Sequence, residues 1–310
     1  MGIKKSSVFV FSFLNLALYF AQVKSIDTVV VFDNQMRKVK LFHTVTTLSP
    51  ADIQKNSSSL SEVLRFQSPV YIKENGRGAV SSPSFRGTTA QQTAFVWNGI
   101  NINSQFLGQG DINNIAVFGY DNLEIKSGGG SVVYGSGAIG GSIHLNNILG
   151  FNNGFEGTLH SEAGSFGTIS HFLKSSYSND RFSFKASANY LISENDYEVP
   201  EERYTNFFGK FQNNTINIGT AYKINSQHTV SWQSQLYDGK QNYPVREENG
   251  NRSRYETQTF RSLLAWDFKT KSFENSFKAA YTEDNFQYFG DVNAPYTSGG
   301  INKNYILKND

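Results

Sequence analysis

The sequence predicts an α+β domain followed by antiparallel transmembrane β-barrel strands. Three observations support this fold class. Charged residues make up 17% of the chain and aromatic residues 15%, whereas an average soluble domain has about 25% charged residues. Apolar and polar residues alternate from residue 151 onward, as expected of strands with one face in lipid and the other in water. Residues 41–150 instead combine short helical and strand patterns with a glycine-rich segment.

Composition excludes several classes of function. The 310-residue chain contains no Cys, so disulfides and thiolate metal sites are absent. Its 28 basic and 26 acidic residues give a net charge of +2, which leaves no basic footprint for nucleic acid. The five His residues are scattered, without the spacing of metal ligands. We therefore predict no catalytic residues, no metal site and no cofactor, and a secreted β-sheet enzyme is the weakest interpretation.

Residues 1–21 have the features of a secretory signal peptide. Lys4 and Lys5 give a positive start, residues 8–20 are apolar, and Ala21 is a small residue suited to cleavage. The apolar stretch is shorter than the roughly 20 residues that a transmembrane helix needs, and an uncleaved anchor is the alternative. No later stretch is suited to span as a helix, so membrane insertion would use strands.

The next segment, residues 22–40, contains a β-branched run from Ile26 to Val31. Taken alone, this run is typical of an ordinary first strand. An extended segment near a free terminus also suits addition to the sheet edge of a partner, because main-chain hydrogen bonds supply the affinity. The residues by themselves leave both interpretations open.

Helical signals follow in residues 41–70. Thr44–Thr47 is rich in β-formers, and Ser49 followed by Pro50 is a helix start. A second short helix is expected from residues that share one apolar face and should end before a proline. The apolar residues are Leu60, Val63 and Leu64, and the proline is Pro69.

A hairpin is expected after the apolar run Thr93–Trp97. Asn98 and Gly99 follow this run directly, and Asn-Gly is a strong signal for a two-residue turn. The polar, glycine-spaced residues 101–114 then predict a loop.

Residues 122–146 are the glycine-rich segment. Leu123–Lys126 and Ser142–Asn146 are strand-like, and the glycines between them indicate turns with positive φ or backbone that other chain approaches closely. A flexible Gly/Ser linker is the alternative. The apolar residues that need burial and favour a packed turn are Ile125, Val132, Val133, Ile139 and Ile143. No helical pattern and no Lys-Ser/Thr pair complete a phosphate-binding loop.

This segment resembles the end of the plug domain of TonB-dependent outer-membrane receptors. The family pattern is roughly I-E-V-x-x-G-x-x-S-x-x-Y-G-x-x-A-x-G-G-x-I-x-I. The matching residues here are Leu123, Glu124, Ile125, Gly128 or Gly129, Ser131, Tyr134, Gly135, Ala138, Gly140, Gly141 and Ile143. Two further segments fit: residues 84–87 resemble the family's S-x-R-G, and residues 93–100 resemble its strand and turn V-L-x-D-G-V. Asn98 replaces the family's Asp, which keeps the turn but puts in doubt a charge pair with Arg86.

The resemblance implies roles for particular residues. Asp27, Thr28, Val29, Val30 and Val31 look like a TonB box, the segment offered to the periplasmic TonB protein. Arg86 and Gly87 are expected to have a structural role, with Arg86 buried and bonding the plug to the barrel wall. A surface position for Arg86 is the alternative. The family's apical loops correspond to residues 71–78 and 101–114. We predict ligand contacts there from Tyr71, Gln105, Phe106 and Gln109, and a loop that makes no ligand contact is the alternative.

Barrel strands are expected in residues 151–310. The predicted strands lie near 155–163, 167–177, 181–193, 208–224, 228–238, 258–269 and 273–286, and an eighth begins near 301. In the third strand, Phe182, Phe184, Ala186, Ala188 and Tyr190 share a lipid-facing side, and Arg181, Ser183, Lys185, Ser187 and Asn189 share a lumen-facing side. Short turns at 179–180, 225–227 and 270–271 alternate with long polar connections at 194–207, 239–257 and 287–300. This alternation is typical of periplasmic turns and extracellular loops.

One of these loops carries several carboxylates. Hard oxygen ligands of this kind suit Ca²⁺, but a solvated extracellular loop is the stronger interpretation. The acidic residues are Glu194, Asp196, Glu198, Glu201 and Glu202.

The resemblance divides the chain into a signal peptide (1–21), an N-terminal segment with the TonB box (22–40), a plug domain (41–150) and the N-terminal part of a barrel (151–310). Barrels of plugged outer-membrane transporters have about 22 strands, so we expect a fragment of a larger receptor. The implied function is energy-coupled uptake of a scarce bulky nutrient across the Gram-negative outer membrane. The nutrient would be a ferric siderophore, haem or cobalamin. The partners would be TonB with its inner-membrane energising complex, the metal chelate or cobalamin, and outer-membrane lipid, with no nucleic acid. A passive pore or adhesin barrel is the alternative.

Overall fold

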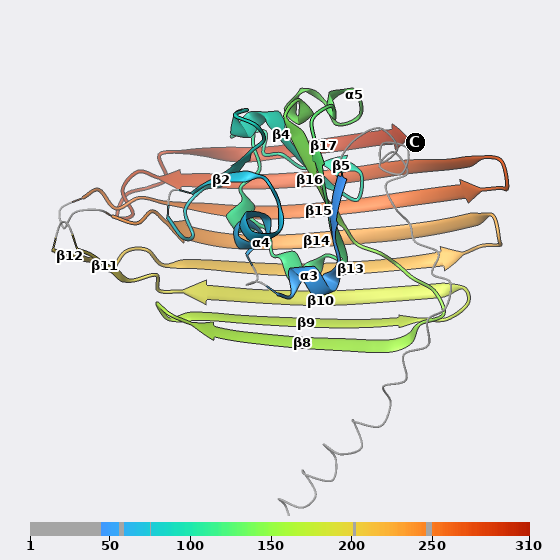
Figure 1. Ribbon diagram of the computed structural model, residues 1–310, viewed down its shortest axis with the longest axis horizontal. Coiled ribbons are helices and arrows are strands. Elements are labelled where there is room, and N and C mark those ends of the chain that lie inside the picture. Colours follow the sequence, from blue (N-terminus) through green and yellow to red (C-terminus); the bar gives the residue numbers. More distant parts are fainter. Residues whose placement is uncertain (1–44, 56–58, 75, 201–202, 246–249) are drawn as a thin grey trace, which may run out of the picture.

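A computed structural model describes residues 45–55, 59–74, 76–200, 203–245 and 250–310 (Figure 1). An inner α+β domain, residues 45–150, lies against one face of a large antiparallel sheet formed by strands within residues 154–309 (Figure 1). Within the described ranges, no helix is long and apolar enough to cross a membrane.

The inner domain is built on a five-stranded mixed sheet. Its strands are β1 (Val45–Leu48), β4 (Thr93–Trp97), β5 (Ile100–Asn101), β6 (Asn122–Ser127) and β7 (Gly141–Asn146), in the order β1-β6-β7-β4-β5. Strands β4 and β7 pair in parallel, and the other pairs are antiparallel. All side chains of β4 and β7 are buried, so this sheet has material on both faces.

Two short α-helices precede the central strands, as the sequence predicts. Helix α3 (Pro50–Ile53) begins with a capping box in which the Ser49 hydroxyl accepts a hydrogen bond from the Asp52 backbone N–H. Helix α4 (Leu60–Gln67) buries Leu60, Val63 and Leu64 completely and ends before Pro69. The remaining elements are β2 (Tyr71–Glu74), β3 (Ser81–Ser84), α5 (Ser131–Tyr134) and the 3-10 turns η2 (Ala90–Gln92), η3 (Ile112–Asn114), η4 (Val117–Gly119) and η5 (Ser136–Ala138).

The Asn98-Gly99 turn joins β4 to β5 as predicted. Asn98 has φ +48° and Gly99 has φ +92°, the two positive values that a type I′ turn requires. Asn tolerates this left-handed conformation better than most residues with a Cβ.

The glycine-rich segment is a packed turn between β6 and β7, and not a linker. Ile125 and Ile143 are buried, but the predicted burial of Val132 and Ile139 is wrong, because they are 100% and 53% exposed. In α5 the buried side chain is Tyr134, and a residue two positions earlier lies about 200° around the helix, on the opposite side. Val132 therefore points away from the domain.

The second sheet has eight antiparallel strands in the order β17-β16-β15-β14-β13-β10-β9-β8. They are β8 (Gly154–Gly164), β9 (Thr168–Ser178), β10 (Phe182–Ser193), β13 (Phe211–Lys223), β14 (His228–Asn242), β15 (Arg254–Lys269), β16 (Glu274–Phe289) and β17 (Ser298–Asn309). Each expected strand is present, and residues 211–223 form one long strand. The connection after β10 also contains a small hairpin, β11 (Tyr197–Val199) with β12 (Tyr204–Asn206), which the sequence pattern did not predict.

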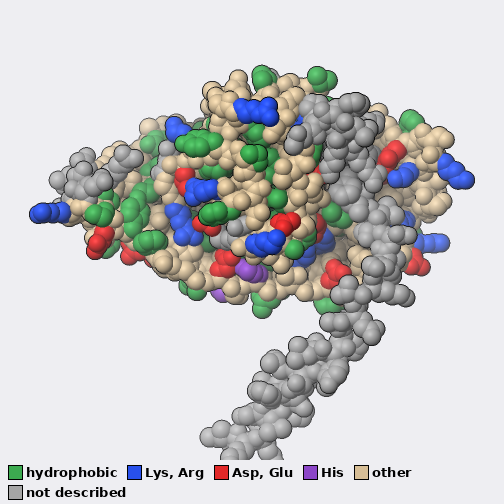
Figure 2. Space-filling model, viewed as in Figure 1, with side chains coloured by type: hydrophobic (Ala, Val, Ile, Leu, Met, Phe, Trp, Pro, Cys, Tyr) green, Lys and Arg blue, Asp and Glu red, His purple; other side chains and the backbone are tan. Residues whose placement is uncertain are grey.

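The two faces of this sheet differ in the predicted sense. In β10, Ser183, Ser187 and Asn189 are buried, whereas Phe184 and Tyr190 are 39% exposed. The polar face is covered by the inner domain, and one apolar cluster includes residues of both, among them Phe172, Leu263 and Ala280 of the sheet. On the side shown in Figure 2, basic and acidic side chains are interspersed, with no patch of one sign.

Candidate functional site

The candidate functional site is the polar contact between the inner domain and the large sheet. The sheet has two distinct ends. Strands β9 and β10, β13 and β14, and β15 and β16 are joined by short turns at one end, whereas the connections after β10, β14 and β16 at the other end are long. Contacts between the inner domain and the sheet occur at both ends and between them.

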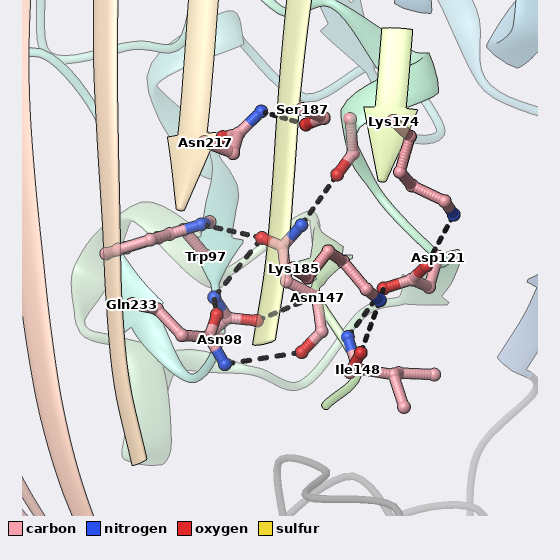
Figure 3. A network of polar contacts seen from close by, with 11 residues as sticks. Trp97, Asn98, Asp121, Asn147, Ile148, Lys174, Lys185, Ser187, Asn217 and Gln233 are labelled. Atoms are coloured by element: carbon pink, nitrogen blue, oxygen red, sulfur yellow. Dashed lines mark hydrogen bonds and ion pairs between the residues drawn. The ribbon is translucent and has the colours of Figure 1, made fainter. Parts of the chain in front are cut away.

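An ion cluster lies toward the short-turn end (Figure 3). The Asp121 carboxylate is 3.1 Å from Lys174 Nζ of β9 and 2.7 Å from Lys185 Nζ of β10. It also accepts a 2.6 Å hydrogen bond from the backbone N–H of Ile148. All three charged side chains are largely buried, with 12–21% exposure. Burial raises the pKa of Asp121, but the two ammonium groups outweigh burial and the net pKa lies below the usual value.

A network of amides lies beside this cluster (Figure 3). Asn147 Oδ1 accepts a 3.1 Å hydrogen bond from Trp97 Nε1, and the Asn147 backbone N–H donates to Asn98 Oδ1 at 2.8 Å. The Asn98 amide donates to Gln233 Oε1 of β14. Gln233 Nε2 returns a 3.4 Å hydrogen bond to the Asn147 carbonyl. The hairpin turn that the sequence predicts is therefore attached directly to the large sheet.

Asn98 makes the contact that was expected of Arg86. The Arg86 side chain is exposed and its backbone has φ +49°. It is therefore not buried against the eight strands of this sheet, and its bond to the barrel wall stays a prediction. The neighbouring Gly87 also has positive φ and open space around it. A left-handed Arg-Gly turn directs the Arg86 side chain to the surface instead of the interface.

A second chain of hydrogen bonds crosses the interface between the two ends. Gln235 of β14 donates to the Tyr120 hydroxyl at 2.9 Å and to Asn217 Oδ1 at 2.8 Å. Arg261 of β15 donates to Gln235 Oε1 at 2.6 Å. Tyr120 is buried, and burial raises its pKa. Its hydroxyl is therefore neutral and accepts from the wall.

A buried carboxylate forms the contact nearest the long connections. Asp111 Oδ2 accepts a 2.6 Å hydrogen bond from the Tyr255 hydroxyl of β15. Its Oδ1 accepts from the backbone N–H groups of Ser81 at 3.2 Å and Asn113 at 3.1 Å. Burial raises the pKa of Asp111 to about 6, against the lowering effect of these hydrogen bonds. A cavity of about 70 Å³ lies next to it and is also lined by Arg261.

The predicted ligand-contacting loops lie at this same end. A Cβ on Gly76 would be 3.2 Å from Pro244, and Asn195 Nδ2 donates to the Arg77 carbonyl at 2.9 Å, so residues 71–78 reach the long connections. The Phe106 ring stacks on Phe286 of β16 with centroids 6.1 Å apart. Gln109 lines the cavity beside Asp111, whereas Tyr71 is 68% exposed and Gln105 is exposed. Ligand contact by these four residues stays a prediction.

The glycines of the matched motif fall into two groups, those with positive φ and those packed closely against other chain. Gly128 and Gly135 have positive φ. Gly140 and Gly141 do not, but they lie against other chain: a Cβ on Gly141 would be 2.6 Å from the Lys126 carbonyl oxygen, and one on Gly140 would meet the Thr88 hydroxyl. Of the two alternatives expected for this pair, close approach is the correct one. Glu124 and Tyr134 are buried within the same motif.

The TonB box and the acidic loop are the two remaining expectations. The TonB box, residues 27–31, and the signal peptide lie outside the described residues. In the acidic loop, Glu194 forms a 2.6 Å ion pair with Lys210. Among the described residues, no three His, Cys, Asp or Glu side chains gather as they would to hold a metal ion, and Glu201 and Glu202 are outside the described ranges.

Sequence reasoning missed Asp111, Asp121 and Asn147 as interface residues. A weak signal existed for Asp121, because Lys185 falls on the polar, inward side of its strand and an inward lysine needs a partner. No pattern within the sequence pairs residues so far apart along the chain.

Known proteins resemble this chain along most of its length. Residues 37–142 match the model of the TonB-dependent Receptor Plug Domain. A vitamin B12 transporter BtuB of Vibrio vulnificus is 30% identical over 135 residues, 42% of this chain and 22% of that protein. One of Photobacterium profundum is 22% identical over 293 residues, 89% of this chain and 46% of that protein.

Solved structures agree on the fold. The crystal structure of the siderophore receptor PirA from Acinetobacter baumannii superposes with a TM-score of 0.67 at 17% identity, covering 91% of this chain and 46% of that one. The chain spans less than half the length of the BtuB proteins and of PirA.

Proposed function

We propose that this chain, whose residues 37–142 match the TonB-dependent receptor plug domain, is part of a receptor of that family for energy-coupled uptake of a bulky metal chelate or cobalamin. A plug domain is followed by antiparallel barrel strands, and receptors of this family are transporters and not enzymes. The proposed location is the outer membrane, with the apolar face of the strands in lipid. The proposed partner is TonB with its inner-membrane complex.

One observation carries the proposal: hydrogen bonds and ion pairs hold the plug to the sheet at both ends of their contact and between them, beside a shared apolar cluster. Asp121, Asn98 and Asp111 each bond directly to a strand of the sheet. Water can replace such bonds when the plug is displaced, so the net loss is about 1 kcal/mol for a neutral hydrogen bond and about 1.5–3 kcal/mol for one to a charged group. An apolar interface would lose its full burial energy without replacement. A polar interface therefore suits a plug that must yield to a pulling partner.

The substrate class rests on the relatives. The BtuB proteins are vitamin B12 transporters and PirA is a siderophore receptor. Both kinds of ligand are metal-containing or metal-binding and too large for simple diffusion through a narrow pore. The cavity beside Asp111 and the loops near it are the places in this chain where such a ligand would first meet the plug.

The test uses the full-length receptor with Val29 replaced. Proline at this position removes a backbone donor from the proposed TonB box, so we expect V29P to abolish uptake while ligand binding persists. The matched control is V29A, which keeps the N–H and should retain most uptake. Uptake by a deletion strain complemented with each variant, on single iron or cobalamin sources, is the readout. Normal uptake by V29P would instead support a passive pore or adhesin barrel.

A further inference from the structure

The inward faces of three adjacent strands, β10, β13 and β14, form a continuous polar strip against the plug. We call this strip the polar lane. Strand pairing arranges it in three rows, and its side chains are mainly hydroxyls and amides. The rows are Asn189, Thr215 and Tyr237, then Ser187, Asn217 and Gln235, then Lys185, Gly219 and Gln233. Figure 3 shows part of the lane, where Asn217 Nδ2 donates a 3.2 Å hydrogen bond to Ser187 Oγ.

Apolar contacts between plug and sheet lie on both sides of the polar lane. The shared apolar cluster includes Phe172 of β9 on one side, and Leu263 of β15 and Ala280 of β16 on the other, with Ile306 of β17 packed against it. Among the described residues, β10, β13 and β14 contribute no member of this cluster. Separating the plug from the flanking strands would expose apolar surface to water, whereas separation at the lane exposes groups that water can hydrogen-bond.

The plug does not fill the space over the polar lane. Cavities of about 70 and 40 Å³ both border Ile115 and Ala116 of the plug. A third cavity of about 10 Å³ lies between Gly119 of the plug and Ser187 of the lane. The two larger cavities have room for water or for small polar groups of a ligand.

Two lane residues line these cavities with no hydrogen-bond partner in the part of the chain that the structure describes. Asn189 lines the 40 Å³ cavity at 5% exposure, and neither its Oδ1 nor its Nδ2 is bonded. Thr215, which pairs with Asn189 across the strands, lines the 70 Å³ cavity at 4% exposure, and its Oγ1 is also unbonded. Most buried polar atoms have a partner. These three atoms are therefore available to polar groups that enter between plug and sheet.

The plug approaches the lane with backbone and with neutral side chains. A Cβ on Gly119 would be 2.7 Å from Asn217 Nδ2, so no side chain stands between the two. The Tyr120 hydroxyl accepts from Gln235 at 2.9 Å, and the one charged lane residue, Lys185, is paired with Asp121. The lane thus offers neutral donors and acceptors, which can exchange hydrogen bonds with a ligand that has both kinds of group on its surface.

We propose that the plug separates from the wall at the polar lane, and that the imported ligand passes between the plug and strands β10, β13 and β14. Strands β10 and β14 are two strand spacings apart, or about 10 Å, so the passing ligand contacts all three strands. This inference rests on the proposed function and adds to it the route of transport through the receptor.

The first experiment measures where the plug separates, by thiol modification of the purified full-length receptor in detergent. This chain contains no Cys, so single cysteines are introduced into a receptor freed of any others. T215C and S187C lie in the lane, and the matched controls T282C and S276C are inward residues of β16. All four residues are comparably buried, at 1–6% exposure.

The lane cysteines should react faster with a maleimide than the cysteines of β16. In urea too dilute to unfold the strands, as checked by far-UV circular dichroism, we expect a rate at least about tenfold higher, equivalent to about 1.4 kcal/mol. Equal rates in the four variants, or faster reaction in β16, would overturn the proposal.

The second experiment tests passage in cells, with cyanocobalamin and ferric enterobactin supplied separately as probes. Modification of T215C by a membrane-impermeant maleimide should increase when the imported probe is added, and V29P in the same chain should abolish the increase. T282C should stay unmodified at the same surface expression. A probe-dependent increase at T282C and none at T215C would place the route elsewhere. Uptake of neither probe would count against the proposed function, while the rates in the purified receptor would still decide where the plug separates.

Discussion

Replacing Gly141 by alanine should loosen the plug. Gly141 begins β7, which is held between β6 on one side and β4 on the other. An added Cβ would lie 2.6 Å from the Lys126 carbonyl oxygen and 2.9 Å from two atoms of the Phe85 ring. The backbone oxygen belongs to the neighbouring strand and cannot rotate away, so β6 and β7 must separate by several tenths of an ångström.

The size of this effect follows from the cost of overpacking. Inserting one methyl group into a well-packed core typically costs about 1–3 kcal/mol. Because one of the contacts is to backbone, we expect about 2 kcal/mol, which is roughly a 30-fold increase in the population of the opened hairpin.

The matched control is G137A in the same segment. There a Cβ would be 3.4 Å from the Gln91 carbonyl oxygen and 3.6 Å from Asn103 Nδ2, which are ordinary contacts. Hydrogen exchange of the full-length receptor in detergent should show about 30-fold lower protection of β6 and β7 in G141A, and a change of less than about twofold in G137A. Cells with G141A should become sensitive to bulky antibiotics at wild-type surface expression. Equal protection in the two variants, or wild-type resistance in both, would refute the packed-turn interpretation.

Three further predictions concern the interface. Burial raises the pKa of Asp111 to about 6, against about 3.9 in an unfolded chain, so its contribution to the free energy of unfolding is complete below about pH 4 and is lost as pH rises through about 6. Hydrogen exchange of residues 104–114, corrected for the intrinsic rate, should therefore be faster near pH 7.5 than near pH 5. D111N should remove this difference. D121N leaves the largely buried Lys174 and Lys185 without their carboxylate and should cost about 3 kcal/mol, seen as faster proteolysis at residues 151–153. The pKa of Asp121 is lowered in the folded protein, so its stabilising effect is present above the unfolded pKa and is lost as pH falls through the folded pKa. Wild type should therefore show the same loosening only below about pH 4. N98A removes the hydrogen bond to Gln233 and places alanine, which has no polar side chain, at φ +48°. Thermal unfolding should therefore show a free energy of unfolding lower by about 2 kcal/mol. N98G also lacks the hydrogen bond but relieves the φ strain, so its free energy of unfolding should fall by less.

Local chemistry made much of the fold predictable. Ser49-Pro50 caps its own helix, Asn98-Gly99 sets its own turn, and the alternation from Phe182 to Tyr190 assigns each side chain to a face. These signals work because the cause lies within a few residues of the effect. The same logic failed for Val132 and Ile139, where apolar character was taken as burial and the short helix α5 turned one of them outward.

The interface could not be predicted in this way. Asp121 meets Lys174 and Lys185 across 53 and 64 residues, and Asp111 meets Tyr255 across 144. Such pairs depend on where the plug sits on the sheet, which no pattern within either segment encodes. The resemblance to the receptor family directed attention to Arg86, yet the contact with the wall is made by Asn98, the position at which this sequence departs from the family pattern.

The apolar cluster that includes both plug and sheet residues has a consequence for biogenesis. Phe172, Leu263 and Ala280 complete a core whose other members, such as Leu64, Phe95 and Ile143, belong to the plug. The plug is synthesised before these strands, so in a receptor exported as proposed its apolar side chains would lack part of their covering until the strands fold. Such an intermediate exposes surface that favours aggregation, and the plug is expected to reach its final order only when strands β9, β15 and β16 close over it. Assembly of the membrane part and completion of the plug would then be a single cooperative event, and a holding factor in the periplasm would be needed until it occurs.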